Sequence, residues 1–208
     1  MKKLLILLFS LFFLSSPSVF ADDISDFQIE GISIGDSLLD YMTEDEILKE
    51  IKRTKDWYLH LKDPSKYSHI SFNKGLNTYG WMSFFVKNNS SNEYITDKNE
   101  KYTILFIRGM MYFIQDFEGC IQKRDEIVEV LSEMFPNARK IENVWTDDLE
   151  PSGNSIFDDV TFIFDSEDRI VARCNNWDEN YRSKENFSEG LHIAIETKEI
   201  FEWSSDYK

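Results

Sequence analysis

VTFIFDSEDRIVARC, residues 160–174, is the stretch of sequence that decides the fold class. Val160, Phe162 and Phe164 recur at every second position, which is the period of a β-strand with one buried face. The acidic run that follows has the composition of a turn, and the apolar run 170–174 then predicts a returning strand. The stretch therefore predicts two antiparallel strands of one sheet.

Further strands are predicted by runs that are rich in aromatic and β-branched residues. These runs are 67–72, 79–86, 102–107, 110–114 and the alternating set Leu191, Ile193 and Ile195. Arg108 and Gly109 separate two of the runs, and this spacing predicts a tight hairpin at that point. The chain thus contains enough predicted strand for an extended antiparallel sheet.

Two main helices are predicted between the strands. Thr43 and Glu46 fit a capping box, so a helix is expected over about 44–61. Residues 117–135 carry apolar side chains along one face of a helix and charged side chains along the other. This order of elements predicts an α+β fold, in which an antiparallel β-sheet has the two main helices packed on one face.

Residues 1–21 have the pattern of a secretory signal peptide. A pair of lysines precedes the apolar run 4–14, which is shorter than the roughly 20 residues that a membrane-crossing helix needs. Cleavage is predicted after Ala21, which leaves residues 22–208 as a single α+β domain. Since no later segment is apolar enough to anchor the mature chain, the sequence predicts a periplasmic or secreted protein.

The mature chain is predicted to be strongly acidic. The full sequence has a net charge of −15, and lysines are the only charged residues that cleavage would remove. A surface of this sign repels phosphate backbones and anionic lipid headgroups, so nucleic acid and membrane surfaces are disfavoured as partners. The excess of acids keeps an exported protein soluble, or alternatively attracts a cationic ligand or a basic partner.

The two cysteines of the chain are Cys120 and Cys174. Cys120 lies on the apolar face of the helix predicted over 117–135, and Cys174 ends a strand whose inward face includes Ile170 and Ala172. Both side chains should therefore point into one core, in a protein that reaches a compartment where disulfides persist. A Cys120–Cys174 disulfide is predicted, and two buried free thiols are the alternative.

Residues 35–38, Gly-Asp-Ser-Leu, resemble the first block of the GDSL, or SGNH, family of serine esterases. The resemblance implies Ser37 as the nucleophile and His192 as the base, with an oxyanion hole supplied by a glycine and an asparagine. The sequence departs from the family pattern at Glu189, because the family has an aspartate three residues before its histidine. Another interpretation is local: the glycine permits a turn, and Ser37 or the aspartate before it caps a short helix.

The sequence predicts neither a metal nor a cofactor. His60, His69 and His192 do not have the spacing of a metal site. No glycine-rich loop with close glycine spacing is present to hold the phosphates of a nucleotide.

The five tryptophans suggest a surface on which a sugar could stack. Trp145, Trp177 and Trp203 lie in polar surroundings, so we expect these three to be exposed. Trp57 and Trp81 lie in patterned segments and are expected in the core.

Residues 27–41 and 117–135 are similar to an uncharacterised family of small exported bacterial proteins, and this resemblance implies no activity. The leading hypothesis is a non-enzymatic periplasmic protein that binds a small molecule or another envelope protein. The alternative is a GDSL-like serine hydrolase that uses Ser37 and His192. The sequence alone does not decide whether the protein is an enzyme.

Overall fold

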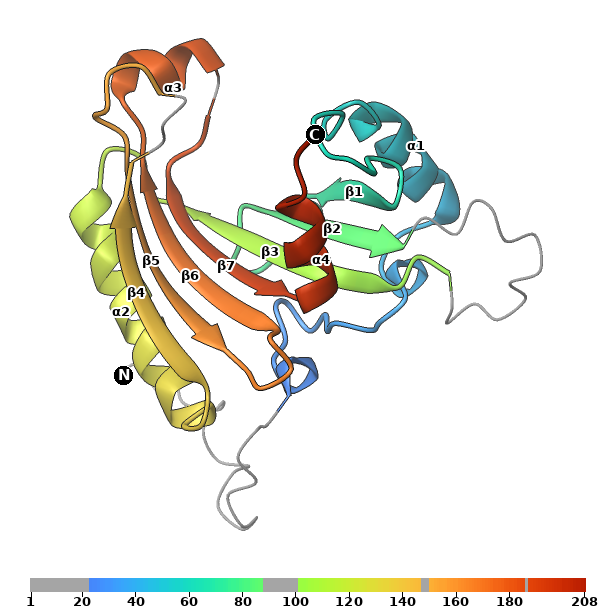
Figure 1. The fold of residues 1–208 in the computed structure, drawn as a ribbon, viewed down its shortest axis with the longest axis horizontal. Helices are drawn as coiled ribbons and strands as arrows, with labels where there is room; N and C mark the ends of the chain where they lie inside the picture. Colours follow the sequence, from blue (N-terminus) through green and yellow to red (C-terminus); the bar gives the residue numbers. More distant parts are fainter. Residues whose placement is uncertain (1–22, 88–100, 147–149, 186) are drawn as a thin grey trace, which may run out of the picture.

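The computed structural model describes residues 23–87, 101–146, 150–185 and 187–208. The predicted signal peptide, residues 1–21, and its cleavage point lie outside the described residues. Within the described part, one strongly twisted sheet runs through the molecule, and helices lie on both of its faces (Figure 1).

The sheet has seven strands in the order β1-β2-β3-β7-β6-β5-β4, and every neighbouring pair is antiparallel. The strands are β1 (Tyr67–Phe72), β2 (Trp81–Lys87), β3 (Ile104–Tyr112), β4 (Arg139–Trp145), β5 (Ile156–Ile163), β6 (Arg169–Asn176) and β7 (Gly190–Glu196). The last strand in the sequence, β7, lies in the middle of the sheet between β3 and β6. The predicted antiparallel sheet in a mixed α and β fold is therefore confirmed.

The α-helices of the described residues are α1 (Glu44–Thr54), α2 (Phe117–Met134), α3 (Glu179–Glu185) and α4 (Lys198–Ser204). α2 packs against β6 and β7, α1 packs against β1, and α4 contacts β3. Ile200 and Trp203 of α4 share a core cluster with Ala194 of β7. Ile193 and Ile195 belong instead to the cluster under α2, so α2 and α4 cover opposite faces of β7.

The prediction that the two main helices pack on one face is not confirmed. α2 covers β6 and β7, whereas α1 packs against β1 at one edge of the sheet. α4, which the sequence pattern does not predict, covers part of the opposite face. The physical reason is that β3 is apolar on both faces, with Phe106 in one core cluster and Ile107 in the other, so both faces need cover.

The prediction of a hairpin at Arg108 and Gly109 is wrong, because β3 runs without a break through both residues. The ring of Tyr79 lies against the strand at this point, and a Cβ on Gly109 would come within 2.5 Å of it. A glycine inside a strand often marks such a close approach of another group. Arg108 therefore lies inside the sheet and not in a turn.

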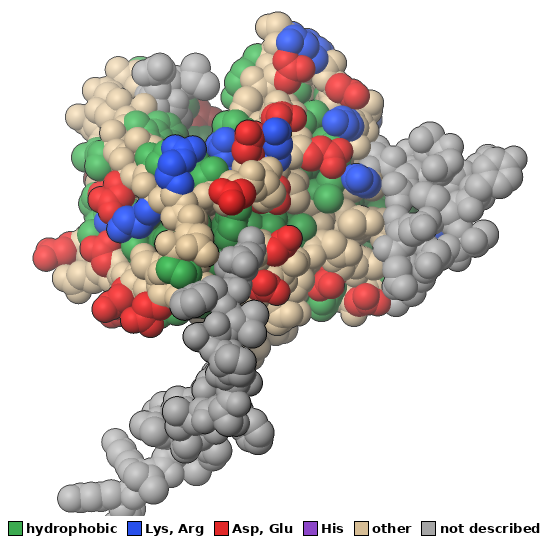
Figure 2. Space-filling view, turned by 60° about the horizontal axis from the view of Figure 1, so that its bottom comes forward, with side chains coloured by type: hydrophobic (Ala, Val, Ile, Leu, Met, Phe, Trp, Pro, Cys, Tyr) green, Lys and Arg blue, Asp and Glu red, His purple; other side chains and the backbone are tan. Residues whose placement is uncertain are grey.

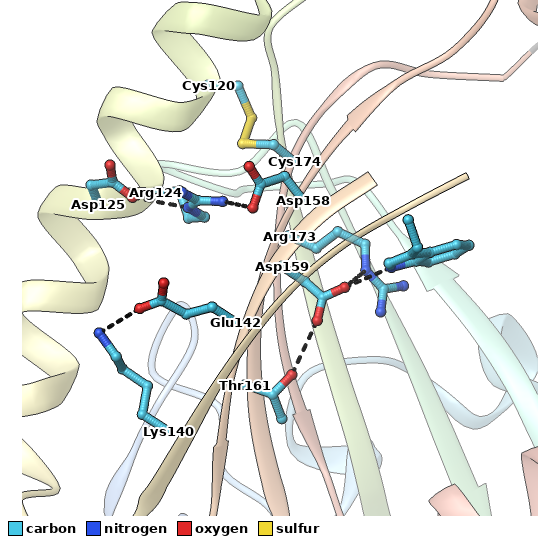
Figure 3. A network of polar contacts seen from close by, with 11 residues as sticks. Cys120, Arg124, Asp125, Lys140, Glu142, Asp158, Asp159, Thr161, Arg173 and Cys174 are labelled. Carbon is cyan, nitrogen blue, oxygen red and sulfur yellow. Dashed lines mark hydrogen bonds and ion pairs between the residues drawn. A yellow bond between two sulfur atoms is a disulfide. The ribbon is translucent and has the colours of Figure 1, made fainter. Parts of the chain in front are cut away.

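Two local predictions are confirmed. Thr43 and Glu46 form the predicted capping box at the start of α1, although α1 is shorter than predicted and ends at Thr54. Cys120 and Cys174 form the predicted disulfide, with their Cα atoms 6.0 Å apart. The bond ties α2 to β6 (Figure 3).

Candidate functional site

The structure does not bring the predicted nucleophile and base together. Ser37 pairs with Thr103, just before β3, whereas His192 pairs with Met110 near the far end of β3. Seven positions along a strand span on the order of 20 Å, which is too far for a hydroxyl to reach an imidazole ring. Glu189, which stands where the esterase family has an aspartate, forms its ion pair with an arginine of α3.

Ser37 has a structural role. Its side chain is 3% exposed, and its Oγ donates a hydrogen bond of 2.8 Å to the carbonyl oxygen of Lys101. The same oxygen accepts a hydrogen bond of 3.4 Å from the backbone N–H of Leu39, which makes Ser37 the N-cap of the short 3-10 helix Leu38–Asp40. This geometry fits the local interpretation of the Gly-Asp-Ser-Leu stretch.

Replacing Ser37 with alanine should lower the free energy of unfolding by about 1 kcal/mol, because a capping hydrogen bond and the donor to Lys101 are lost. Urea unfolding followed by tryptophan fluorescence measures the change. A fluorophosphonate probe should label neither the wild type nor the variant. Labelling of the wild type that disappears in a folded Ser37→Ala variant would support the hydrolase alternative instead.

A cleft of about 930 Å³ opens on the sheet face opposite to α2, a size that suits small-molecule sites. β1, β2, β3, β6 and β7 contribute to its floor, and its walls are the turn after α1 and the segment after α3. In Figure 1, α1 and α3 stand on either side of this part of the sheet. The lining residues are Glu50, Arg53, Trp57, Tyr58, His69, Ser71, Phe72, Asn73, Gly80, Trp81, Arg108, Met110, Tyr112, Asn175, Trp177, Phe187, Ser188 and His192.

The strand register brings polar side chains from distant parts of the sequence together on this face of the sheet. Ser83 of β2 lies opposite Arg108 of β3. Met110 of β3 lies opposite His192 of β7, which in turn lies opposite Arg173 of β6. Because side chains alternate along a strand, Arg108 and His192 point to the same face from neighbouring strands.

Arg108 is the charged residue of the floor that has no partner. It forms no hydrogen bond or ion pair with another described residue, and its Nε is buried without an acceptor. Its guanidinium carbon lies 5.1 Å from the ring centroid of Trp81 and 5.8 Å from that of Phe106. Cation–π contacts of this kind offset part of the cost of burial, but they give the N–H groups no acceptor.

Both histidines of the cleft are neutral at pH 7. His69 is 4% exposed, and burial is the main reason why its pKa falls to about 3, with the charges of Arg108 and Arg53 acting in the same direction. Burial and the charge of Arg108 also hold the pKa of His192 well below its ordinary value. Nε2 of His192 lies 3.1 Å from Nδ2 of Asn175, and a neutral ring can accept that hydrogen bond.

Aromatic rings form the walls of the cleft. Trp57, in the turn after α1, is 49% exposed, and Phe187, after α3, is 41% exposed. Trp177 packs against Phe187 with the two ring centroids 4.5 Å apart. Tyr112, at the end of β3, is 50% exposed. Large rings that face a concavity next to a few polar groups are typical of small-molecule sites.

The predictions for the tryptophans are correct in part. Trp177 lines the cleft, and Trp145 is 39% exposed. The predicted exposure of Trp203 is wrong, because this side chain is 5% exposed in the core beneath α4. The prediction that Trp57 is buried is also wrong, because α1 ends before this residue and its ring reaches the cleft wall. Trp81 lines the floor of the cleft.

A polar network occupies the same sheet face beside the cleft, toward β4 (Figure 3). Asp159 is 4% exposed and accepts a hydrogen bond of 2.7 Å from Nε1 of Trp145. Thr161 donates to the same carboxylate, and Nε of Arg173 lies 3.6 Å from it. Arg173 thus has a carboxylate within ion-pair distance, whereas Arg108 forms no ion pair with a described carboxylate and is influenced by Glu196 only at longer range.

Comparison with family models, with curated proteins and with solved structures finds no match for this chain. The two family resemblances of the sequence therefore stay predictions. Across the described ranges, no helix is long and apolar enough to cross a membrane. The same ranges contain no group of three or more His, Cys, Asp or Glu side chains that could hold a metal ion.

Of the residues that define the cleft, the sequence singles out the histidines and tryptophans but misses Arg108 and Asn175. A signal for Arg108 exists, because it is the one charged residue within the apolar stretch 104–112 that forms β3. A charged side chain inside such a strand needs either an ion-pair partner or a role in binding or catalysis, which would mark Arg108 as a functional candidate. Asn175 carries no comparable signal.

Proposed function

We propose that this protein is exported by its signal peptide and binds a small organic molecule in the cleft without converting it chemically. The observation that carries the proposal is the presence, in one concavity, of an unpaired arginine and exposed aromatic rings. Leaving Nε of Arg108 without an acceptor costs stability, and such groups call for a specific explanation. A bound molecule would supply the acceptor and cover the rings.

The chemistry of the cleft favours binding over catalysis. Neither of the serines that line it, Ser71 and Ser188, is hydrogen-bonded to a histidine ring. His192 is instead joined to Asn175 and packs edge-on against Trp81. A histidine with a pKa of about 3, as for His69, is too weak a base to take protons efficiently at neutral pH.

The outer surface differs from the cleft in how its charges are arranged. The face seen in Figure 2 carries Asp and Glu side chains beside Lys and Arg side chains. Exposed pairs of this kind contribute only about 0–1 kcal/mol each, and they keep the surface hydrated. The cleft, by contrast, combines Arg108, which has no ion-pair partner, with apolar rings, and this combination suits recognition of a specific molecule.

Removal of one wall of the cleft tests the proposal. Phenylnaphthylamine, an uncharged fluorescent probe, should bind the wild type saturably. Trp57→Ala should weaken this binding about tenfold, because truncating an aromatic anchor commonly costs 1 kcal/mol or more. Trp145→Ala is the matched control, since it removes a ring that is 39% exposed but lies outside the cleft.

Fluorescence titration of the three proteins measures the dissociation constants. The proteins are recovered from the periplasm of an exporting host, where the denatured mass should correspond to a chain that begins at Asp22. The binding proposal fails if the wild type shows no saturable binding, or if Trp145→Ala weakens binding as much as Trp57→Ala. The export proposal fails if the signal peptide is still attached.

A further inference from the structure

The charged side chains that line the cleft do not balance. Glu50 and Arg53 form an ion pair of 2.7 Å and cancel each other. His69 and His192 carry no charge at pH 7. Arg108 therefore gives the described part of the cleft a net positive charge, in a chain whose total charge is −15.

Further polar atoms without a hydrogen-bond partner lie on the same face of the sheet as Arg108. Ser83 is fully buried directly opposite Arg108, and its Oγ has no partner in the protein. Nδ1 of His69, a side chain that is 4% exposed and lines the cleft, has none either. Oδ1 of Asn175 is another such atom on the floor. Unmet hydrogen-bonding capacity that is gathered in one place points to a polar group of a bound molecule.

We propose that the ligand is a ring-bearing organic anion. Its carboxylate, sulfonate or phosphate group binds the guanidinium of Arg108, and its rings lie against the aromatic walls formed by Trp57 and Phe187. This inference rests on the proposed function and adds the charge of the ligand to it. The anionic group accepts hydrogen bonds from the guanidinium of Arg108, and it offsets the cost of removing the guanidinium from water.

Other kinds of ligand fit the cleft less well. A cationic ligand would meet Arg108, and the carboxylate that lines the described part of the cleft, Glu50, is already paired with Arg53. A neutral ligand would leave the guanidinium without an ion-pair partner and would bury it further. The acidic outer surface repels anions, but salt largely screens this repulsion at distances beyond about 8–10 Å. Recognition is therefore local to Arg108.

Two fluorescent probes that share their rings separate the effect of charge from that of shape. Anilinonaphthalene sulfonate carries a sulfonate that phenylnaphthylamine lacks. The wild type should bind the sulfonate about tenfold more tightly than the uncharged probe. Arg108→Met should remove this preference: it weakens sulfonate binding about tenfold and changes phenylnaphthylamine binding less than about twofold.

Arg139→Met is the matched control, because it removes an exposed arginine of β4 that does not line the cleft. It should change the binding of neither probe. Equal weakening of both probes by Arg108→Met, or no weakening of either, would overturn the inference, whereas saturable phenylnaphthylamine binding would still support the proposed function. A wild type that binds neither probe overturns both.

A competition experiment with the wild type keeps the inference testable if Arg108→Met does not fold. Naphthalene carboxylate should displace bound phenylnaphthylamine at a concentration about tenfold lower than naphthalene methanol does. The two competitors have similar rings and differ in charge. Equal potency would show that the cleft does not recognise an anionic group.

Discussion

Replacing Cys120 and Cys174 together with alanine should lower the free energy of unfolding by about 4 kcal/mol. The bond spans a sequence separation of 54 residues, and without it the unfolded chain regains the corresponding loop-closure entropy. Both side chains are almost fully buried, at 1% and 0% exposed, so the alanines also leave small cavities. Lost packing adds to the entropic effect and does not oppose it.

Urea unfolding at pH 7, with and without a reducing agent, measures this loss. Reduced wild type should lose nearly as much stability as the double variant does. The double variant should not respond to the reducing agent, which separates loss of the bond from a general effect of reduction. A double variant within about 1 kcal/mol of the oxidised wild type would contradict the entropic account.

Acidification from about pH 6.5 to about pH 4.5 should lower the free energy of unfolding by about 2–3 kcal/mol through His69 alone. In the unfolded chain this ring binds a proton below about pH 6.5, whereas in the folded protein its pKa is about 3. The unfolded state therefore binds more protons throughout the interval, and stability falls as the pH falls. His192 acts with the same sign, because its pKa is also lowered.

Urea unfolding at several pH values measures the slope. His69→Phe, which keeps a ring among the neighbouring Trp57, Tyr58 and Phe85 but cannot titrate, should have a shallower slope. An unchanged slope in His69→Phe would show that this ring binds its proton equally well in both states.

Local sequence pattern is sufficient for part of this fold. The alternation of Ile170, Ala172 and Cys174 defines the inward face of β6, and helical spacing directs Cys120 toward the same core. The disulfide follows from these two patterns together. The cap at Ser37 is likewise a local property, because its hydrogen bond to Leu39 spans two residues.

Other elements depend on contacts that no local pattern contains. Arg108 and Gly109 have the composition of a turn, but they lie in a strand, where both pair with β2 on one side and with β7 on the other. β4 is equally hidden in the sequence, since Val144 is 69% exposed and most of the strand faces water. Its pairing with β5, and not burial, defines it as a strand.

The cleft is the least predictable part, since its residues come from strands at both ends of the sequence. His69 reaches it from β1, and His192 reaches it from β7. They share one concavity because β7 lies next to β3 in the strand order, and neither periodicity nor turn composition specifies that order. Arg108 becomes part of the cleft floor only when β2 and β7 pair with β3 on its two sides.

The central position of β7 also sets the order in which the seven-stranded sheet can form during folding. In the described residues, β7 is the strand that joins β3 to β6, and it is the last of the described strands in the sequence, so it is also the last to be synthesised. Until it arrives, β3 and β6 each present an open edge to which other chains can add. The arrival of β7 closes both edges in a single event.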